Sequence, residues 1–184
     1  IGGITFGIGM GDGGTTSEAN ETSYGVSYSA SVNGADVSVS YAAANTGAAN
    51  TAAASTDLSA SSMAVGVTVG KVSLAAAQNA EKTDRVDDNA SATGTTDMKS
   101  TNMGVTYAVT DSLTLEAASV AASGTTAGSA DYKYDESAYG VAYTIATGLT
   151  LTASYSDWTE SGTGASTGAD VSGTGTTVKL AVSF

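Results

Sequence analysis

The chain has 184 residues, with 6 basic and 18 acidic side chains and no His, Cys or Pro, and its Leu, Ile, Val and Phe residues together number only 29. The absence of His and Cys excludes a thiol nucleophile, a Ser-His pair, a disulfide and the usual zinc sites. The net charge of −12 argues against nucleic acid as a partner, and with so few large apolar residues the composition alone favours disorder.

The order of the side chains contradicts disorder, because large apolar residues recur at alternate positions. Residues 4–10 form the first such run, and similar runs begin at Tyr24, Met63, Met103, Tyr139 and Val178. A period of two residues predicts a strand with one apolar face. Each of the runs from 24, 63, 103 and 139 is followed by a short link and a second alternating run, which predicts a β-hairpin. The links are Asn33-Gly34, Gly70-Lys71, Thr110-Asp111-Ser112 and Thr147-Gly148.

Longer polar stretches separate the hairpins and contain most of the acidic residues. Together the runs predict ten antiparallel strands, with short turns and both chain ends on one side and long loops on the other. This arrangement is typical of bacterial outer-membrane barrels. We therefore predict one domain over residues 1–184, an all-β, transmembrane, antiparallel up-and-down β-barrel. The predicted long loops lie near residues 11–20, 45–57, 80–98, 122–134 and 159–172.

The two faces of the predicted strands differ in size and polarity. One carries the large apolar residues and the other carries Ser, Thr, Gly and Ala with almost no Lys or Glu, which is unusual for a surface in water. In a membrane barrel the apolar face meets lipid and the small polar face lines the lumen. Tyrosines at two levels of the apolar face predict aromatic girdles at the membrane interfaces. The girdle residues are Tyr24, Tyr28, Tyr41, Tyr107, Tyr139, Tyr143 and Tyr155.

The hairpin at residues 137–155 and the last strand, Thr177-Val-Lys-Leu-Ala-Val-Ser-Phe184, resemble a Gram-negative outer-membrane general porin, especially the alphaproteobacterial kind. The resemblance covers the whole chain, in pattern rather than in long identical motifs. It implies an outer-membrane location, a water-filled barrel of sixteen strands and often a trimer. A terminal Phe that closes an alternating strand resembles the signal read by the outer-membrane assembly machinery, so Phe184 is the candidate assembly signal.

Ten strands leave two possibilities, the C-terminal part of a larger porin or a complete small barrel. The small side chains of the predicted inner face cannot pack a closed ten-strand core, which favours a water-filled lumen in a larger barrel. The chain starts at Ile1 without the features of a signal peptide, so we interpret it as a mature or truncated product.

Two groups of charged residues are candidates for lining or narrowing the pore. Glu116 and Lys179 have the parity of lumen-facing residues, and charges in a lumen bias ion selectivity. The segment 81–89 is the densest charge cluster, and it is either a loop folded inward as a constriction or a solvated external loop. Its oxygen ligands could bind Ca²⁺ or Mg²⁺, although the spacing matches no EF-hand, and no other cofactor is predicted. The constriction candidates are Lys82, Asp84, Arg85, Asp87 and Asp88.

The function that the sequence favours is passive diffusion of small hydrophilic solutes and ions, with a weak cation preference from the acidic mouth. We predict no enzyme, because the catalytic His of outer-membrane barrel proteases and phospholipases has no counterpart. The expected partners are outer-membrane lipid and lipopolysaccharide, two further copies in a homotrimer and the assembly machinery. The alternatives are a secreted or surface β-repeat protein, such as an adhesin solenoid, and a barrel that acts as an anchor without conducting.

Overall fold

The structure is a computed structural model, and it describes residues 2–11, 21–46, 55–86, 94–126, 129–162 and 170–183. Within these ranges the regular structure consists of ten β-strands, as predicted. No helix in the described part of the chain is long and apolar enough to cross a membrane. The strands are β1 (Gly3–Gly11), β2 (Glu21–Val32), β3 (Ala35–Thr46), β4 (Ser55–Val69), β5 (Val72–Val86), β6 (Gly94–Ala108), β7 (Leu113–Thr126), β8 (Ser129–Ala146), β9 (Leu149–Ser161) and β10 (Val171–Val182).

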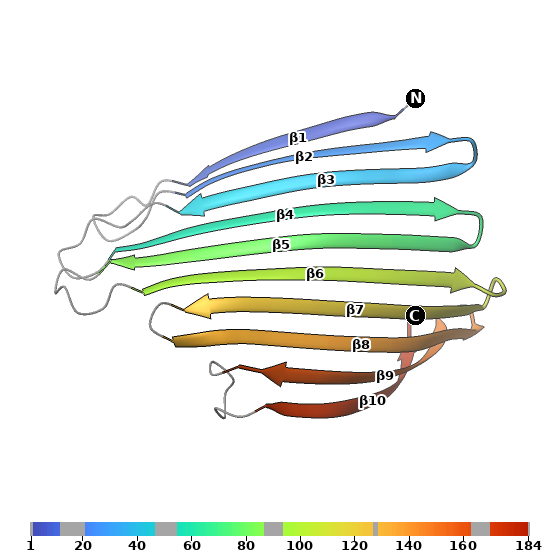
Figure 1. Cartoon of the computed structure of the whole chain (residues 1–184). Helices are drawn as coiled ribbons and strands as arrows, with labels where there is room; N and C mark the ends of the chain where they lie inside the picture. Colours follow the sequence, from blue (N-terminus) through green and yellow to red (C-terminus); the bar gives the residue numbers. More distant parts are fainter. Residues whose placement is uncertain are drawn as a thin grey trace.

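The ten strands form one sheet in which every strand pairs with its neighbours in sequence (Figure 1). All nine pairings are antiparallel. Strands β1 and β10 are the two edges and do not pair with each other, so the sheet is curved but open. The solenoid alternative is therefore wrong for this part of the chain, because a meander of adjacent antiparallel strands is not a stack of coils.

The short turns lie at one end of the sheet, at the positions predicted from the sequence (Figure 1). At the first turn Asn33 has a φ of 52° and Gly34 a φ of 81°, the left-handed pair that a type I′ hairpin requires. Gly70 and Gly148 have φ values of 58° and 78° in two of the other short turns. Glycine and asparagine tolerate this conformation at little steric cost, which explains why these residues close the hairpins.

The register places the alternating large apolar residues of the predicted strand runs on one face, called here the outer face. Ile4, for example, pairs with Tyr28, and the row continues through Val39 to Val65. The opposite, inner face carries Ser, Thr, Gly and Ala, as in the row from Ser27 through Ser40 to Ala64. The parity predicted from the sequence is thus confirmed.

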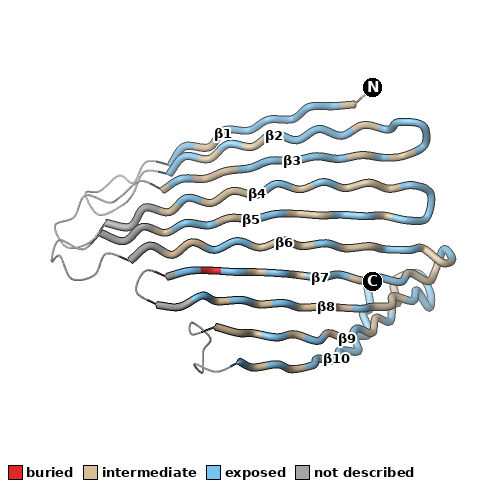
Figure 2. The backbone as a smooth tube through the Cα atoms, in the orientation of Figure 1, coloured by how far each residue is buried: buried red, intermediate tan, exposed pale blue. Residues whose placement is uncertain are grey.

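Neither face contains a packed core (Figure 2). Among the described residues no large side chain is fully buried, and Phe6 and Tyr139 on the outer face are 75% and 58% exposed. On β8 the small inner residues are nevertheless half-buried while most of the outer ones are exposed. An exposed apolar face of this extent is typical of a surface that meets lipid or another protein.

The predicted long loops are wrong in extent, because the strands continue well past the apolar residues. β5 runs to Val86 and β6 begins at Gly94, so the stretch predicted as a loop at 80–98 is largely strand. Likewise, β7 ends at Thr126 and β8 begins at Ser129, inside the predicted loop 122–134. The prediction ended each strand where the apolar alternation ended. Antiparallel pairing carries the strands further, because backbone hydrogen bonds do not require apolar side chains.

Candidate functional site

The position of the apolar row on the outer face shifts along the strand direction from each strand to the next. In β1 the row from Ile4 to Met10 is centred on Gly7. Following the pairing register from Gly7 across the sheet leads to Val171 in β10. The apolar row of β10 is centred on Leu180, nine residues further along, which is one residue per strand.

This displacement shows that the strands are tilted relative to the axis of the apolar belt. With a rise of about 3.3 Å per residue and about 4.8 Å between strands, one residue per strand corresponds to strands inclined by about 35° to the axis of the apolar belt. Strands of outer-membrane barrels are tilted by about 35–45°. The outer-face residues that follow this slanted line, from Ile4–Met10 in β1 to Val178–Val182 in β10, are called the apolar belt.

The predicted girdle tyrosines all lie on the outer face and follow the same slant. The centre line of the belt passes through Val26, Val105 and Val141. On this line the tyrosines fall into two tiers: Tyr28, Tyr107 and Tyr143 lie on the short-turn side, and Tyr24, Tyr41, Tyr139 and Tyr155 lie on the long-loop side.

The inner face accommodates its few larger side chains by placing glycine on the neighbouring strand. The Glu116 side chain lies where a Cβ on Gly140 would be, and the ring of Trp158 lies over Gly173. Met98 lies against Gly124, which is buried. Small residues therefore leave room along this wall rather than filling it.

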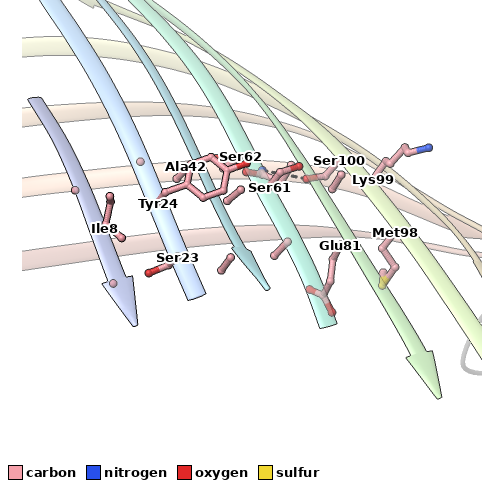
Figure 3. Close-up of a pocket in the computed structure, with 18 of the residues that line it drawn as sticks. Ile8, Ser23, Tyr24, Ala42, Ser61, Ser62, Glu81, Met98, Lys99 and Ser100 are labelled. Atoms are coloured by element: carbon pink, nitrogen blue, oxygen red, sulfur yellow. Dashed lines mark hydrogen bonds between the residues drawn. The ribbon is translucent and has the colours of Figure 1, made fainter. Parts of the chain in front are cut away.

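A hollow of about 800 Å³ lies against the long-loop half of β1 to β7 and is lined mostly by small inner-face residues. Figure 3 shows the alternation at this place, with Ser23, Glu81 and Met98 on one side of the ribbon and Tyr24 and Lys99 on the other. Asn79 donates a hydrogen bond to Ser100 Oγ at 3.2 Å across the wall of this hollow. The hollow is open, and its lining is mostly glycine, alanine and a few serine hydroxyls.

Glu116 and Lys179 lie on the inner face at the depth of the belt centre. The register row of Glu116 passes through Gly140 and Ser154 to Thr177, two residues from Lys179. The structure thus places both charges within the sheet at mid-depth, three strands apart. Together they form the candidate selectivity site predicted from sequence.

The inner face at the long-loop end is acidic. Its described charged side chains are all glutamates, spread over four strands, and no Lys or Arg with a described side chain faces inward at this end. The outer face beyond the belt carries both signs, with Lys99 and Asp97 3.8 Å apart. The inward glutamates are Glu21, Glu81, Glu136 and Glu160.

The predicted constriction loop is not a loop where the structure describes it. Glu81 and Lys82 lie in β5, and the backbone of Asp84 and Arg85 continues the strand. Lys82 faces outward, in the row of Ser59 and Asp97, so it does not line the inner face. Asp87 and Asp88, with the cation site expected there, lie outside the described residues. In the described part of the chain, no group of three or more acidic side chains could hold a metal ion.

Sequence reasoning missed an inner-face aromatic cluster, called here the aromatic shelf: Tyr132, Tyr134 and Trp158. Tyr132 and Tyr134 lie in the predicted loop 122–134 and Trp158 lies directly before the predicted loop 159–172, but the alternation Tyr132, Tyr134, Glu136 was a detectable sign that β8 continues. Tyr134 stacks on Trp158 with 6.3 Å between ring centroids and 20° between ring planes. The Tyr134 hydroxyl donates a hydrogen bond to Glu136 Oε2 at 2.9 Å.

Gly173, over which the ring of Trp158 lies, gives a first testable prediction. A Cβ on Gly173 would lie 2.8 Å from Cζ2 of Trp158, so Gly173→Ala should displace the indole. We expect a shifted tryptophan emission and a loss of about 1–3 kcal/mol, the usual cost of overpacking. Gly175→Ala is the matched control, because its Cβ would meet only Ser156 Oγ at 3.3 Å. Equal emission spectra for both variants would contradict the packing of Trp158 over Gly173.

The tyrosines of the aromatic shelf give a second prediction, on alkaline stability. Partial burial, then the carboxylate of Glu160, raises the pKa of Tyr132 above 10.0, and burial with the Glu136 hydrogen bond raises the pKa of Tyr134. The neutral phenols therefore stabilise the folded state below pH 10, and this contribution is lost as the pH rises through the raised values. A Tyr132→Phe, Tyr134→Phe double variant should lose two phenolates that ionise above the usual range, and its stability should fall less steeply at alkaline pH than that of the unmodified chain. An unchanged titration curve would contradict the prediction.

Comparison with known proteins agrees with this geometry at the level of the fold. The chain is similar to OmpTdeltaL8, a loop L8 deletion mutant of OmpT, an outer membrane protein of Vibrio cholerae, with a TM-score of 0.64 and 15% identity. It is also similar to the alcaligin outer membrane receptor FauA from Bordetella pertussis, with a TM-score of 0.65 and 13% identity. The similarity covers 97% of this chain in both cases, but 58% of the Vibrio chain and 34% of the Bordetella chain.

No family model and no curated protein sequence matches the chain. The fold is therefore that of an outer-membrane β-barrel wall, and the chain spans a little over half of the first of these two barrel proteins and about a third of the second.

Proposed function

We propose that the chain forms the wall of a general porin in a bacterial outer membrane, and that it conducts small hydrophilic solutes and ions by passive diffusion with a weak cation preference. The observation that carries the proposal is the opposition of the two faces. A slanted apolar belt covers the outer face at the tilt of a membrane barrel, while the inner face is small and hydroxyl-rich.

The open edges of the sheet support a larger barrel. Unpaired backbone groups of β1 and β10 cannot face lipid, where each unsatisfied group costs several kcal/mol. In the proposed channel both edges therefore pair with further strands, as in the sixteen-strand barrel that the porin resemblance implies. The 58% coverage of the Vibrio barrel protein is consistent with this size.

The proposed mechanism needs no moving part and no chemistry on the solute. Hydroxyls and small side chains keep the lumen wet, and solutes move down their gradient. The glutamates at the long-loop mouth, among them Glu81 and Glu136, concentrate cations, and Glu116 with Lys179 sets the field at mid-depth. A passive channel of this kind is not an enzyme.

The proposed partners follow from the same placement. Outward lysines beyond the belt, Lys99 and Lys133, lie at the level of lipid headgroups and suit the phosphates of lipopolysaccharide. A homotrimer and recognition of Phe184 by the assembly machinery complete the porin proposal.

Conductance across a planar bilayer tests the function. The expected result is stepwise insertion, a current proportional to voltage at low potential, and a reversal potential in a salt gradient that indicates cation preference. A protein that inserts but carries no current at any voltage would overturn the channel and leave the non-conducting anchor.

A further inference from the structure

The aromatic residues are divided unequally between the two faces. The outer face carries Phe6 and seven tyrosines, all of them in the apolar belt. The inner face carries only the aromatic shelf, within the part of the chain that the structure describes. The shelf lies on β8 and β9 at the long-loop end, beyond the depth of the belt, where membrane lipid cannot account for its apolar area.

The rings of the shelf form a supported, accessible surface. Trp158 lies over Gly173 and stacks with Tyr134, so both rings are held against the wall. The flanking inner-face residues on β7 and β10 are small or aliphatic: Val120, Ala122 and Val171. The shelf residues are half-buried rather than enclosed, which leaves part of the aromatic surface accessible.

The polar groups beside the rings are acceptors and anions. Glu136 is opposite Trp158 and Glu160 is opposite Tyr134 in the register, so carboxylates and rings alternate on the wall. The Tyr134 hydroxyl already donates to Glu136, and Glu160 lies close enough to raise the pKa of both shelf tyrosines. Lys179, a described cation on the inner face, is far from the aromatic shelf, because it lies at the depth of the belt centre.

We propose that the aromatic shelf, with Glu136 and Glu160, is a binding subsite for organic cations that carry an ammonium group on an apolar body. An aromatic face attracts a cation through its quadrupole, and a nearby carboxylate adds a charge pair. An anion is repelled here, and a neutral sugar gains nothing from the charge. The inference rests on the proposed function, because it names the solute class that the channel would concentrate at its mouth.

Trp158 is the one tryptophan of the chain, so its fluorescence reports on the shelf alone. The full chain, folded in zwitterionic micelles, is titrated with benzyltrimethylammonium at low salt, with maltose and benzenesulfonate as the neutral and anionic probes. We expect a saturable change with the cation only, weakened at least fivefold in Glu160→Gln and in Glu136→Gln. Asp157→Asn, next to Trp158 but on the outer face, should bind as the unmodified chain does.

Each outcome decides the inference. A saturable response to maltose equal to that of the cation, or a cation response unchanged in both Gln variants, overturns it. If one Gln variant does not fold, as judged by circular dichroism, the other decides, and Tyr134→Leu, which removes the ring stacked on Trp158, should also weaken the cation response. A protein that conducts without a cation response refutes the subsite alone. A cation response in a protein that does not conduct keeps the subsite and refutes the channel.

Discussion

Val65→Lys should lower the free energy of unfolding in lipid vesicles by about 2–4 kcal/mol, the cost of a Lys facing lipid at mid-depth. Val65 is on the outer face, is 43% exposed and lies on the centre line of the apolar belt. The ammonium would have to leave water for hydrocarbon or deform the bilayer to reach the interface. Reversible urea titration of the protein in vesicles measures the change.

Two matched variants isolate the cause. Ala64→Lys changes the adjacent residue on the inner face at almost the same depth, and it should cost far less because the lysine extends into a wet lumen. Ser59→Lys is on the outer face but beyond the belt, at the level of the outward row with Lys82, and it should cost about 0–1 kcal/mol. A larger cost for Ala64→Lys than for Val65→Lys would reverse the assignment of the two faces.

The strand count, the short turns and the two faces could be predicted because each has a local cause. The alternation of apolar and small residues shows which residues share a face of a strand. Asn33-Gly34 is a typical sequence for a turn with left-handed backbone conformation. The ends of the strands on the long-loop side have no such local signal. Residues such as Glu81 and Lys82 extend the sheet because the neighbouring strands offer partners, and pairing of this kind depends on segments distant in sequence.

The same reason explains which parts of the candidate site were found. Glu116 and Lys179 lie inside runs of clear alternation, so parity alone placed them on the inner face. Trp158 and Tyr134 lie beyond the apolar belt, where polar residues occupy both faces and the period of two is obscured. Their stacking depends on the pairing of β8 with β9, and only the register shows it.

Glu116→Lys should shift the selectivity of the proposed channel toward anions. At about 10 Å in a water-filled lumen, the interaction energy between one unit charge and a monovalent ion is about 0.4 kcal/mol. Because the substitution changes the charge by two units, it should alter the local cation concentration by about fourfold. The effect should be largest at or below 0.1 M salt and nearly vanish at 1 M, where the Debye length is about 3 Å. The reversal potential in a salt gradient measures it.

The position of Glu116 makes this substitution informative. Its side chain lies over Gly140, so on that strand it has no neighbouring side chain to displace. Lys179→Glu, at nearly the same depth, should move the reversal potential in the opposite direction, toward cations. Asp157→Lys makes the same change of two charges on the outer face, and lipid and protein should separate it from the ion path. Because Glu116→Lys and Asp157→Lys make the same change in net charge, equal shifts for these two variants would mean that overall charge, not a charged inner wall, sets the selectivity.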